Sequence, residues 1–295
     1  MVDGDSYASL RERVVGEHGV VMLIGAPDTG KTTLAKLLIS DALAAGRKVA
    51  FVDGDVGVPT VGPPACVGLK WIGSQDDLAN LAIEDDLRFV GSLQPDGVVL
   101  QHVVASADLV GIAHREADFI VLDTTGAVSG VVSQTLDYHL MELCNPALVI
   151  AMQRGSELEP TVGMLKRFLG ARVARAQPPA DLVPAGPVEA RQRRIAAFRQ
   201  ALRPPLQQWR VQPTVFAPTL PEEFDLEKLA GMLVGVQDGS GRCLGLGVVQ
   251  YEDGVLRVAT RHGEDMKGLR LGSLRIDQET FDTSRVWLRQ LIFGV

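Results

Sequence analysis

The sequence predicts an α/β fold: a P-loop NTPase core with a parallel sheet and helices on both faces, plus a small C-terminal β domain. Short apolar runs alternate with helical patterns between residues 20 and 152, as in βαβ units. A glycine-rich motif directly follows the first of these runs. After Pro204 and Pro205 the pattern changes to short β-like segments separated by Gly and Asp clusters. We therefore expect one domain at residues 1–205 and a second at 206–295.

Composition narrows the class of protein. The chain has 295 residues, of which 46% are apolar, and this is ample for a folded core. No run approaches the ~20 apolar residues of a membrane span. The first residues lack the pattern of a secretory signal, so we expect a cytoplasmic protein with no membrane partner. The net charge of −7 argues against nucleic-acid binding on average, although it leaves room for local basic patches.

Cysteine usage gives no sign of a disulfide framework or a zinc site. Cys66, Cys144 and Cys243 are far apart in the sequence, odd in number and without a C-x-x-C pair. We expect them to be small core or near-surface residues.

The motif at residues 25–33 matches the phosphate-binding pattern G-x-x-x-x-G-K-[ST] at every fixed position. An apolar run precedes it and a helical pattern follows, which is the strand, loop and helix context that such a loop requires. Its backbone N–H groups can point at phosphate oxygens, Lys31 can reach the β- and γ-phosphates, and the Thr32 hydroxyl can bind Mg²⁺. The residues expected at the nucleotide are Gly25, Ala26, Pro27, Asp28, Thr29, Gly30, Lys31, Thr32 and Thr33.

Acidic residues follow two further predicted core strands. Residues 48–52 lead into Asp53 and Asp55, and residues 119–122 lead into Asp123. The carboxyl ends of parallel strands meet at one edge of a sheet, where ligands bind. We therefore expect Asp53 and Asp123, together with Thr32, to hold a metal ion and Asp55 to act on a nucleophile. A purely structural role in capping or turn formation is the alternative.

The remaining elements follow from their residue patterns. Gly and Pro are frequent in residues 57–75, so we expect a structured loop that covers the ligand, with Thr60 and Lys70 available on it. Further strands are predicted at 87–90 and 147–152, and helices at 6–15, 98–114 and 133–143. In the C-terminal part, strands are predicted at 211–216, 232–236, 243–251, 255–260 and 269–276, with hairpin turns at 238–241 and 252–254.

Basic residues are concentrated between residues 166 and 203, where nine Lys or Arg stand against two acids, Asp181 and Glu189. A proline-rich stretch at 177–187 is expected to be mobile, and a helix is expected at 188–202. This region predicts a lid that closes arginines over a transferring phosphate or a phosphodiester backbone. A solvated helix face is the alternative. The arginines on the predicted helix are Arg191, Arg193, Arg194 and Arg199.

Residues 123–126, Asp-Thr-Thr-Gly, match the D-x-x-G element of GTPases. The strand at 147–152, however, leads into Gln-Arg-Gly and not into an Asn-Lys-x-Asp that would read guanine. A GTPase is therefore not predicted. An ATPase switch, in which Asp55 would position water, stays open.

Five short motifs occur along the chain in the same order as in the polynucleotide 5′-hydroxyl kinase family, and together they resemble that family. This family includes the P-loop subunit of the eukaryotic pre-mRNA cleavage and polyadenylation factor and smaller archaeal and bacterial relatives. The resemblance runs from about residue 20 to residue 203, and the β tail is similar to that of the compact members. It implies transfer of the γ-phosphate of ATP, or another NTP, to the 5′-OH of RNA or DNA in RNA processing or repair, with Mg²⁺. The motifs lie at 25–33, 52–57, 60–64, 89–92 and 123–126.

The resemblance also implies roles for single residues. Lys31 would hold the β- and γ-phosphates, and Asp55 would accept or orient the proton of the 5′-hydroxyl. Thr125 and Gly126 would clasp the substrate near its 5′ end. The arginines that would stabilise charge on the transferring phosphoryl group are Arg191, Arg193 and Arg194.

Two positions depart from the family pattern. Val58 stands where the family has a Gln, which removes an amide that could orient Mg²⁺-bound water or the substrate. Ala127 stands where many eukaryotic members have a Trp that could stack on a base. Val58 motivates an alternative function, that of a nucleotide-bound scaffold in an RNA-processing assembly.

Overall fold

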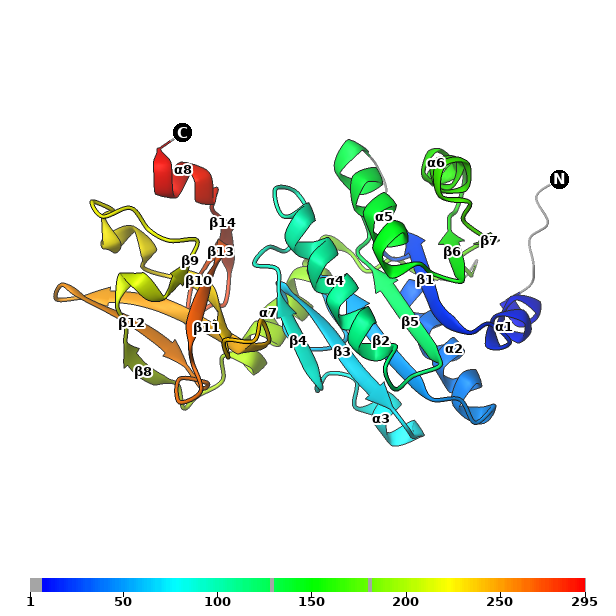
Figure 1. Ribbon diagram of the computed structural model, residues 1–295, viewed down its shortest axis with the longest axis horizontal. Coiled ribbons are helices and arrows are strands. Elements are labelled where there is room, and N and C mark those ends of the chain that lie inside the picture. Colours follow the sequence, from blue (N-terminus) through cyan, green and yellow to red (C-terminus); the bar gives the residue numbers. More distant parts are fainter. Residues whose placement is uncertain (1–6, 128–129, 180–181, 295) are drawn as a thin grey trace.

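The computed structural model describes residues 7–127, 130–179 and 182–294, and it contains two sheets (Figure 1). The first sheet has seven strands in the order β4-β3-β2-β5-β1-β6-β7. Its strands are β1 (Gly19–Gly25), β2 (Val49–Gly54), β3 (Cys66–Ile72), β4 (Asp86–Phe89), β5 (Phe119–Thr124), β6 (Leu148–Met152) and β7 (Val173–Ala176). Within the described ranges, no helix is both long and apolar enough to cross a membrane.

The four predicted strands β2, β5, β1 and β6 pair in parallel as expected, and β7, which was not predicted, adds to β6 in parallel. The exception is β3, which runs antiparallel to both β2 and β4. The loop predicted at 57–75 is therefore wrong beyond residue 65. The prolines end at Pro64, and the largely apolar segment Cys66–Ile72 hydrogen-bonds along the edge of β2. Lys70, on β3, forms an ion pair with Asp85 at 3.3 Å instead of facing the ligand site.

Helices cover both faces of the first sheet, because successive residues of its strands point to opposite sides. In β1, Val21 and Leu23 pack on one side and Met22 and Ile24 on the other, and all four are buried. The predicted core with helices on both faces is thus confirmed, although Ser6, the predicted first residue of the first helix, lies outside the described residues. One face carries α1 (Tyr7–Val15), α2 (Lys31–Ala44) and α3 (Gln75–Ala79), and the other carries α4 (Val99–Ala113), α5 (Gly130–Cys144) and α6 (Glu159–Leu169).

The second sheet is formed by the C-terminal residues. Its order is β14-β13-β10-β11-β12-β8, and β9 pairs with β13 in parallel. The hairpins β10-β11 and β11-β12 turn where the Gly and Asp clusters predict them. The elements are β8 (Gln207–Arg210), β9 (Phe216–Ala217), β10 (Met232–Gln237), β11 (Cys243–Glu252), β12 (Val255–Thr260), β13 (Gly268–Ile276), β14 (Thr283–Arg285) and the helix α8 (Leu288–Phe293).

The strand predicted at 211–216 is wrong. Strand β8 ends at Arg210, and a 3-10 turn occupies Pro213–Val215 before the two residues of β9. Pro213 has no N–H group to donate to a strand ladder, so the chain turns at this point.

Helix α7 (Pro187–Ala201) lies between the two sheets (Figure 1). Its Phe198 and the following Leu202 are buried in a cluster that contains Phe89 of β4 and Leu246 of β11. The helix predicted at 188–202 is therefore present, and its C-terminal half is anchored in a core that both sheets share.

The basic region is not one continuous lid. Residues 166–169 end α6, and residues 173–176 form β7, an edge strand of the first sheet. Arg175 of β7 forms a two-contact ion pair with Glu159 of α6, with both contacts at 2.8 Å. The part of the predicted lid before residue 177 is therefore built into the first sheet. A division into domains at residue 205 stays a prediction.

Candidate active site

The loop at residues 25–33 connects the end of β1 to the start of α2. Gly30, which precedes α2, has φ of 87°, a left-handed conformation that glycine adopts without strain. A Cβ on Gly25 would lie 2.6 Å from the Met152 carbonyl oxygen, so only glycine fits beside β6. The Thr29 hydroxyl donates to the Ala26 carbonyl at 2.9 Å, which holds the loop from inside. These contacts give the predicted strand, loop and helix arrangement.

Lys31 lies inside this loop. Its Nζ donates to the carbonyl oxygens of Gly25, at 2.8 Å, and Ala26, at 3.0 Å, and its side chain is nearly buried. A cation held within the loop adds to the N-terminal dipole of α2, and both attract phosphate.

Thr32 and Asp123 form the second polar pair of the site. The Thr32 hydroxyl donates to Asp123 Oδ2 at 2.6 Å, while Asp123 Oδ1 is buried without a partner among the described residues. Burial raises the pKa of Asp123 to about 6, although Lys31 and the Thr32 hydroxyl oppose this shift. A hydroxyl beside a carboxylate oxygen that lacks a partner is a donor set that suits Mg²⁺.

Asp53 lies at the end of β2 but does not line the ligand cavity. Its Oδ1 accepts from the Asp55 N–H at 2.9 Å, and its Oδ2 accepts from the N–H groups of Thr60 at 2.5 Å and Val61 at 3.0 Å. Burial raises the pKa of Asp53, Asp123 and Asp55 add repulsion, and the N–H donors oppose the shift. Asp53 therefore organises the turn at 53–61. The metal role predicted for it is not favoured by this geometry.

Asp55 points into the cavity at the start of that turn. Its Oδ1 accepts from the N–H groups of Gly57 at 2.9 Å and Val58 at 3.2 Å. Within the described part of the chain its Oδ2 has no hydrogen-bond partner. Behind the turn, buried His102 of α4 contacts the Gly54 carbonyl through Nε2 at 2.8 Å, and burial lowers its pKa to about 4. A neutral histidine thus donates to the turn that presents Asp55.

The three predicted lid arginines have different surroundings. Arg194 donates from Nε to the Gly57 carbonyl at 3.1 Å, half-buried beside Asp55. Arg193 lines the same cavity and pairs with Glu189, one turn earlier on α7. Arg191 is not brought to the cavity. Its Nε donates to Asp282 Oδ1 at 3.0 Å in the C-terminal part, and its Nη2 contacts the other carboxylate oxygen.

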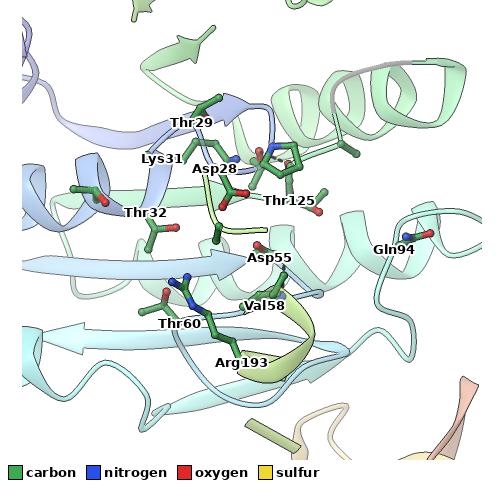
Figure 2. A pocket seen from close by; sticks show the side chains of 18 of the residues that line it. Asp28, Thr29, Lys31, Thr32, Asp55, Val58, Thr60, Gln94, Thr125 and Arg193 are labelled. Carbon is green, nitrogen blue, oxygen red and sulfur yellow. Dashed lines mark hydrogen bonds between the residues drawn. The ribbon is translucent and has the colours of Figure 1, made fainter. Parts of the chain in front are cut away.

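These elements enclose one cavity of about 760 Å³. Figure 2 shows Lys31, Thr32, Asp55 and Arg193 around it, with Gln94 at the end away from Thr32. Five of the predicted site residues do not line the cavity: Gly25, Ala26, Asp53, Asp123 and Arg191. The predicted residues that it brings together at the lining are Pro27, Asp28, Thr29, Gly30, Lys31, Thr32, Thr33, Asp55, Thr125, Gly126, Arg193 and Arg194.

Some lining residues were missed by the sequence reasoning. Gln94 and Asp96 come from the loop after β4, and Lys36 and Ser133 come from α2 and α5. The loop after β4 could have been found, because β4 is a predicted strand whose carboxyl end lies at the same edge as that of β2. Lys36 and Ser133 lie within helices and carry no such local signal.

The fold and the cavity define a P-loop protein that binds a nucleoside phosphate. A phosphate loop, an acid with one oxygen without a partner and two arginines line one cavity, and Asp123 lies behind its lining, bonded to Thr32. Among the described residues, no group of three His, Cys, Asp or Glu side chains is placed to hold a metal alone. This fits Mg²⁺, which usually takes only one or two carboxylates and completes its shell with phosphates and water.

Comparison with known proteins identifies the family. A family model described as the mRNA cleavage and polyadenylation factor CLP1 P-loop matches residues 25–201, more than half of the chain. The chain belongs to this family.

Individual relatives support the same identification. A polyribonucleotide 5′-hydroxyl-kinase of Pyrococcus furiosus is 27% identical, over 98% of this chain and 90% of that protein. One of Methanocaldococcus jannaschii is 35% identical over half of this chain, which spans 40% of that relative. The wild-type Clp1p–Pcf11p complex contains a chain with the same fold. Its TM-score is 0.69 at 13% identity, and the match covers 91% of this chain and 78% of that one.

Proposed function

We propose that this protein is an ATP- and Mg²⁺-dependent polynucleotide 5′-hydroxyl kinase. One observation carries the proposal: the phosphate loop, Asp55 and two arginines of α7 line a single cavity. Relatives that align over nearly the whole chain are named polyribonucleotide 5′-hydroxyl-kinases, which supports the same reaction.

The residues of the cavity suit this reaction. The 5′ oxygen of the polynucleotide forms a bond to the γ-phosphorus while the bond from that phosphorus to the β–γ bridging oxygen breaks, which yields ADP and a 5′-phosphate end. Asp55 Oδ2 takes the hydroxyl proton, and Lys31 holds the β- and γ-phosphates. Arg193 and Arg194 stabilise charge on the transferring group, since this transition state needs mainly positioning and charge neutralisation.

Thr32 and Asp123 would hold Mg²⁺ in this site, and the ion would neutralise charge on the β- and γ-phosphates. Asp53 holds the turn that presents Asp55. Thr125 and Gly126 line the cavity beside Pro27, and in this proposal they would contact the 5′ end of the substrate.

The test is transfer of labelled γ-phosphate to 5′-OH oligonucleotides of RNA and of DNA. Lys31→Ala and Asp55→Asn should each reduce the rate by at least about a hundredfold while the proteins stay folded. Transfer that survives in Asp55→Asn would reject the assigned base. Lys70→Ala is the control, because Lys70 lies on β3 in an ion pair away from the cavity.

A second function is favoured by Val58. This apolar residue lines the cavity next to Asp55, where a polar side chain could help to orient a substrate. A nucleotide-bound scaffold would bind ATP without transferring phosphate to any oligonucleotide. An ATPase switch would release phosphate to water without an oligonucleotide. The same assay, run with and without 5′-OH RNA, separates these outcomes.

A further inference from the structure

A second cavity adjoins the first one at the junction of the two sheets. It has a volume of about 490 Å³ and includes Asp96, which also lines the first cavity. The loop after β4 therefore lies between the two cavities. On its far side, the second cavity is lined by β13, β14 and the start of α8, which bring Arg270, Arg285, Trp287 and Arg289.

The charge of this cavity is opposite to that of the whole chain. Three arginines line it against a single acid, Asp96, while the protein carries a net charge of −7. None of the three arginines forms an ion pair with a carboxylate of a described residue. Arg285 uses one N–H on the Asp96 carbonyl oxygen, at 2.9 Å. Most guanidinium donors of this group therefore remain available for an anion.

Trp287 supplies a flat apolar surface among these arginines. Its side chain is 55% exposed, although large aromatic residues are usually buried. A Cβ on Gly97 would lie 3.5 Å from the indole ring, so the ring rests against the loop after β4. The Arg285 guanidinium stacks over the ring at 3.8 Å from its centroid. Both groups can stack on a nucleobase.

We propose that this cavity, lined by Arg270, Arg285, Trp287 and Arg289, binds the single-stranded part of the polynucleotide substrate just beyond its 5′-terminal nucleotides. Arginines for phosphates and an aromatic ring for a base are the features of a binding site for single-stranded nucleic acid that does not read sequence. Because Asp96 lines both cavities, the second cavity lies next to the one that would hold the 5′ end. This inference rests on the proposed kinase function, because that function supplies the 5′ end.

The first experiment measures binding without catalysis. A 5′-phosphorylated single strand of about a dozen nucleotides is the reaction product and accepts no further phosphate at that end. It should quench the fluorescence of Trp287, and the quench should be absent from Trp287→Phe. Trp287→Ala should weaken binding by about tenfold. Arg285→Ala and Arg289→Ala should each reduce the slope of log affinity against log salt by about 0.7.

The second experiment uses substrate length. Trp287→Ala should raise KM for a long 5′-OH strand by about tenfold and leave the rate with a dinucleotide unchanged. Phe168→Ala is the matched control, since Phe168 is 67% exposed and also stacks with an arginine, Arg167, but lies on α6. It should change neither value.

The outcomes distinguish this inference from the proposed function. Phosphoryl transfer whose KM for every length is the same in Trp287→Ala as in the parent would overturn the cavity assignment and leave the kinase intact. Product binding that depends on Trp287 without any phosphoryl transfer would support the cavity and reject the kinase.

Discussion

At the scale of single residues, the arginines of α7 give a direct test of the site. Arg193 and Arg194 line the catalytic cavity, whereas Arg191, on the same helix, is bound to Asp282. Arg193→Ala and Arg194→Ala should each lower kcat by about a hundredfold, because each removes a cation from the transferring phosphoryl group. Arg191→Ala should change kcat less than about threefold. Steady-state kinetics with a 5′-OH oligonucleotide at saturating ATP measures the difference.

A lysine variant tests whether Arg194 acts through its charge alone or also through the geometry of its guanidinium group. Arg194→Lys keeps the charge but cannot reproduce the geometry of a guanidinium, so it should recover only part of the lost rate. If all three alanine variants are as active as the parent, Arg193 and Arg194 do not act on the transferring phosphoryl group and the assignment is wrong.

Asp137 on α5 offers a prediction about pH. It is buried, its Oδ2 has no partner among the described residues, and burial raises its pKa to about 7 while Lys31 opposes the shift. A carboxyl whose folded pKa is raised holds its proton longer in the folded state than in the unfolded state. Its contribution to stability is therefore largest below the unfolded pKa of about 4 and is lost as pH rises towards 7.

Asp137→Asn should remove this dependence. The free energy of unfolding of the variant relative to the parent should rise by roughly 2–3 kcal/mol between pH 5 and pH 8. Urea titrations at both pH values measure it, with Asp253→Asn at an exposed position as the control. Parallel pH profiles for parent and variant would show that Asp137 is ionised throughout this range.

The residues of the site were only partly predictable. The phosphate loop could be found because all the residues that define its motif lie within nine consecutive positions. Asp53 and Asp55 are two positions apart at one strand end, so the sequence places both near the nucleotide. Only the structure shows that Asp53 accepts from the N–H groups of Thr60 and Val61 while Asp55 faces the cavity. Likewise, the partner of Arg191 is 91 positions away.

At the scale of elements, the turn at 53–61, which follows β2, positions Asp55, the proposed base. The Asp53 carboxylate fixes three N–H groups of this turn, which in turn presents Asp55. Asp53→Asn replaces one acceptor oxygen with an NH₂ group that faces backbone donors. We expect a loss of about 1–3 kcal/mol in stability and a lower kcat, because Asp55 is held less firmly.

The same variant separates a positioning role from a metal role. If Asp53 only holds the turn, the Mg²⁺ concentration at half-maximal rate should be unchanged in Asp53→Asn. Asp123→Asn should raise that concentration at least tenfold, since Asp123 Oδ1 is the buried oxygen without a partner beside Thr32. An equal rise in both variants would restore the metal role of Asp53.

Element prediction failed where strand pairing, not local pattern, decides the structure. Strand β3 follows nine residues rich in Gly and Pro, and a local window assigns the whole stretch to a loop. The segment becomes a strand because its residues pair with β2 from Val49↔Ile72 to Asp53↔Gly68. The parallel strands β1, β2, β5 and β6 were easier to predict, since each contains an apolar run that is buried on both faces.

At the scale of the whole molecule, the two sheets share part of their core. Phe89 and Leu87 of β4 lie in one cluster with Leu233, Leu246 and other residues of the second sheet. The Ser273 N–H of β13 also donates to the Gly91 carbonyl after β4, at 2.6 Å. Composition and turn signals predict a change of structure near residue 205, but they contain no information on how tightly the two parts pack.

This packing predicts that the two sheets unfold together. Gly235 of β10 lies against Phe89, and a Cβ at Gly235 would fall 2.4 Å from the Phe89 ring. Gly235→Ala should therefore cost about 1–3 kcal/mol by overpacking the junction. Gly163→Ala on α6 is the control, because a Cβ there meets no atom within 4 Å and alanine favours a helix.

Two tryptophans make the cooperativity measurable. Trp71 lies on β3 of the first sheet and Trp209 on β8 of the second, so variants that keep one of them, with the other tryptophans changed to Phe, report each sheet separately. Both probes should show a single transition at the same urea concentration, and Gly235→Ala should move both equally, since coincident probes indicate two-state unfolding.

Movement of the Trp209 transition alone would show that the second sheet unfolds independently and that its contact with β4 adds little stability. The cavity proposed for the single strand would then lie at a junction that can open, since its arginines and Trp287 belong to the second sheet and to α8, and its boundary with the catalytic cavity belongs to the loop after β4.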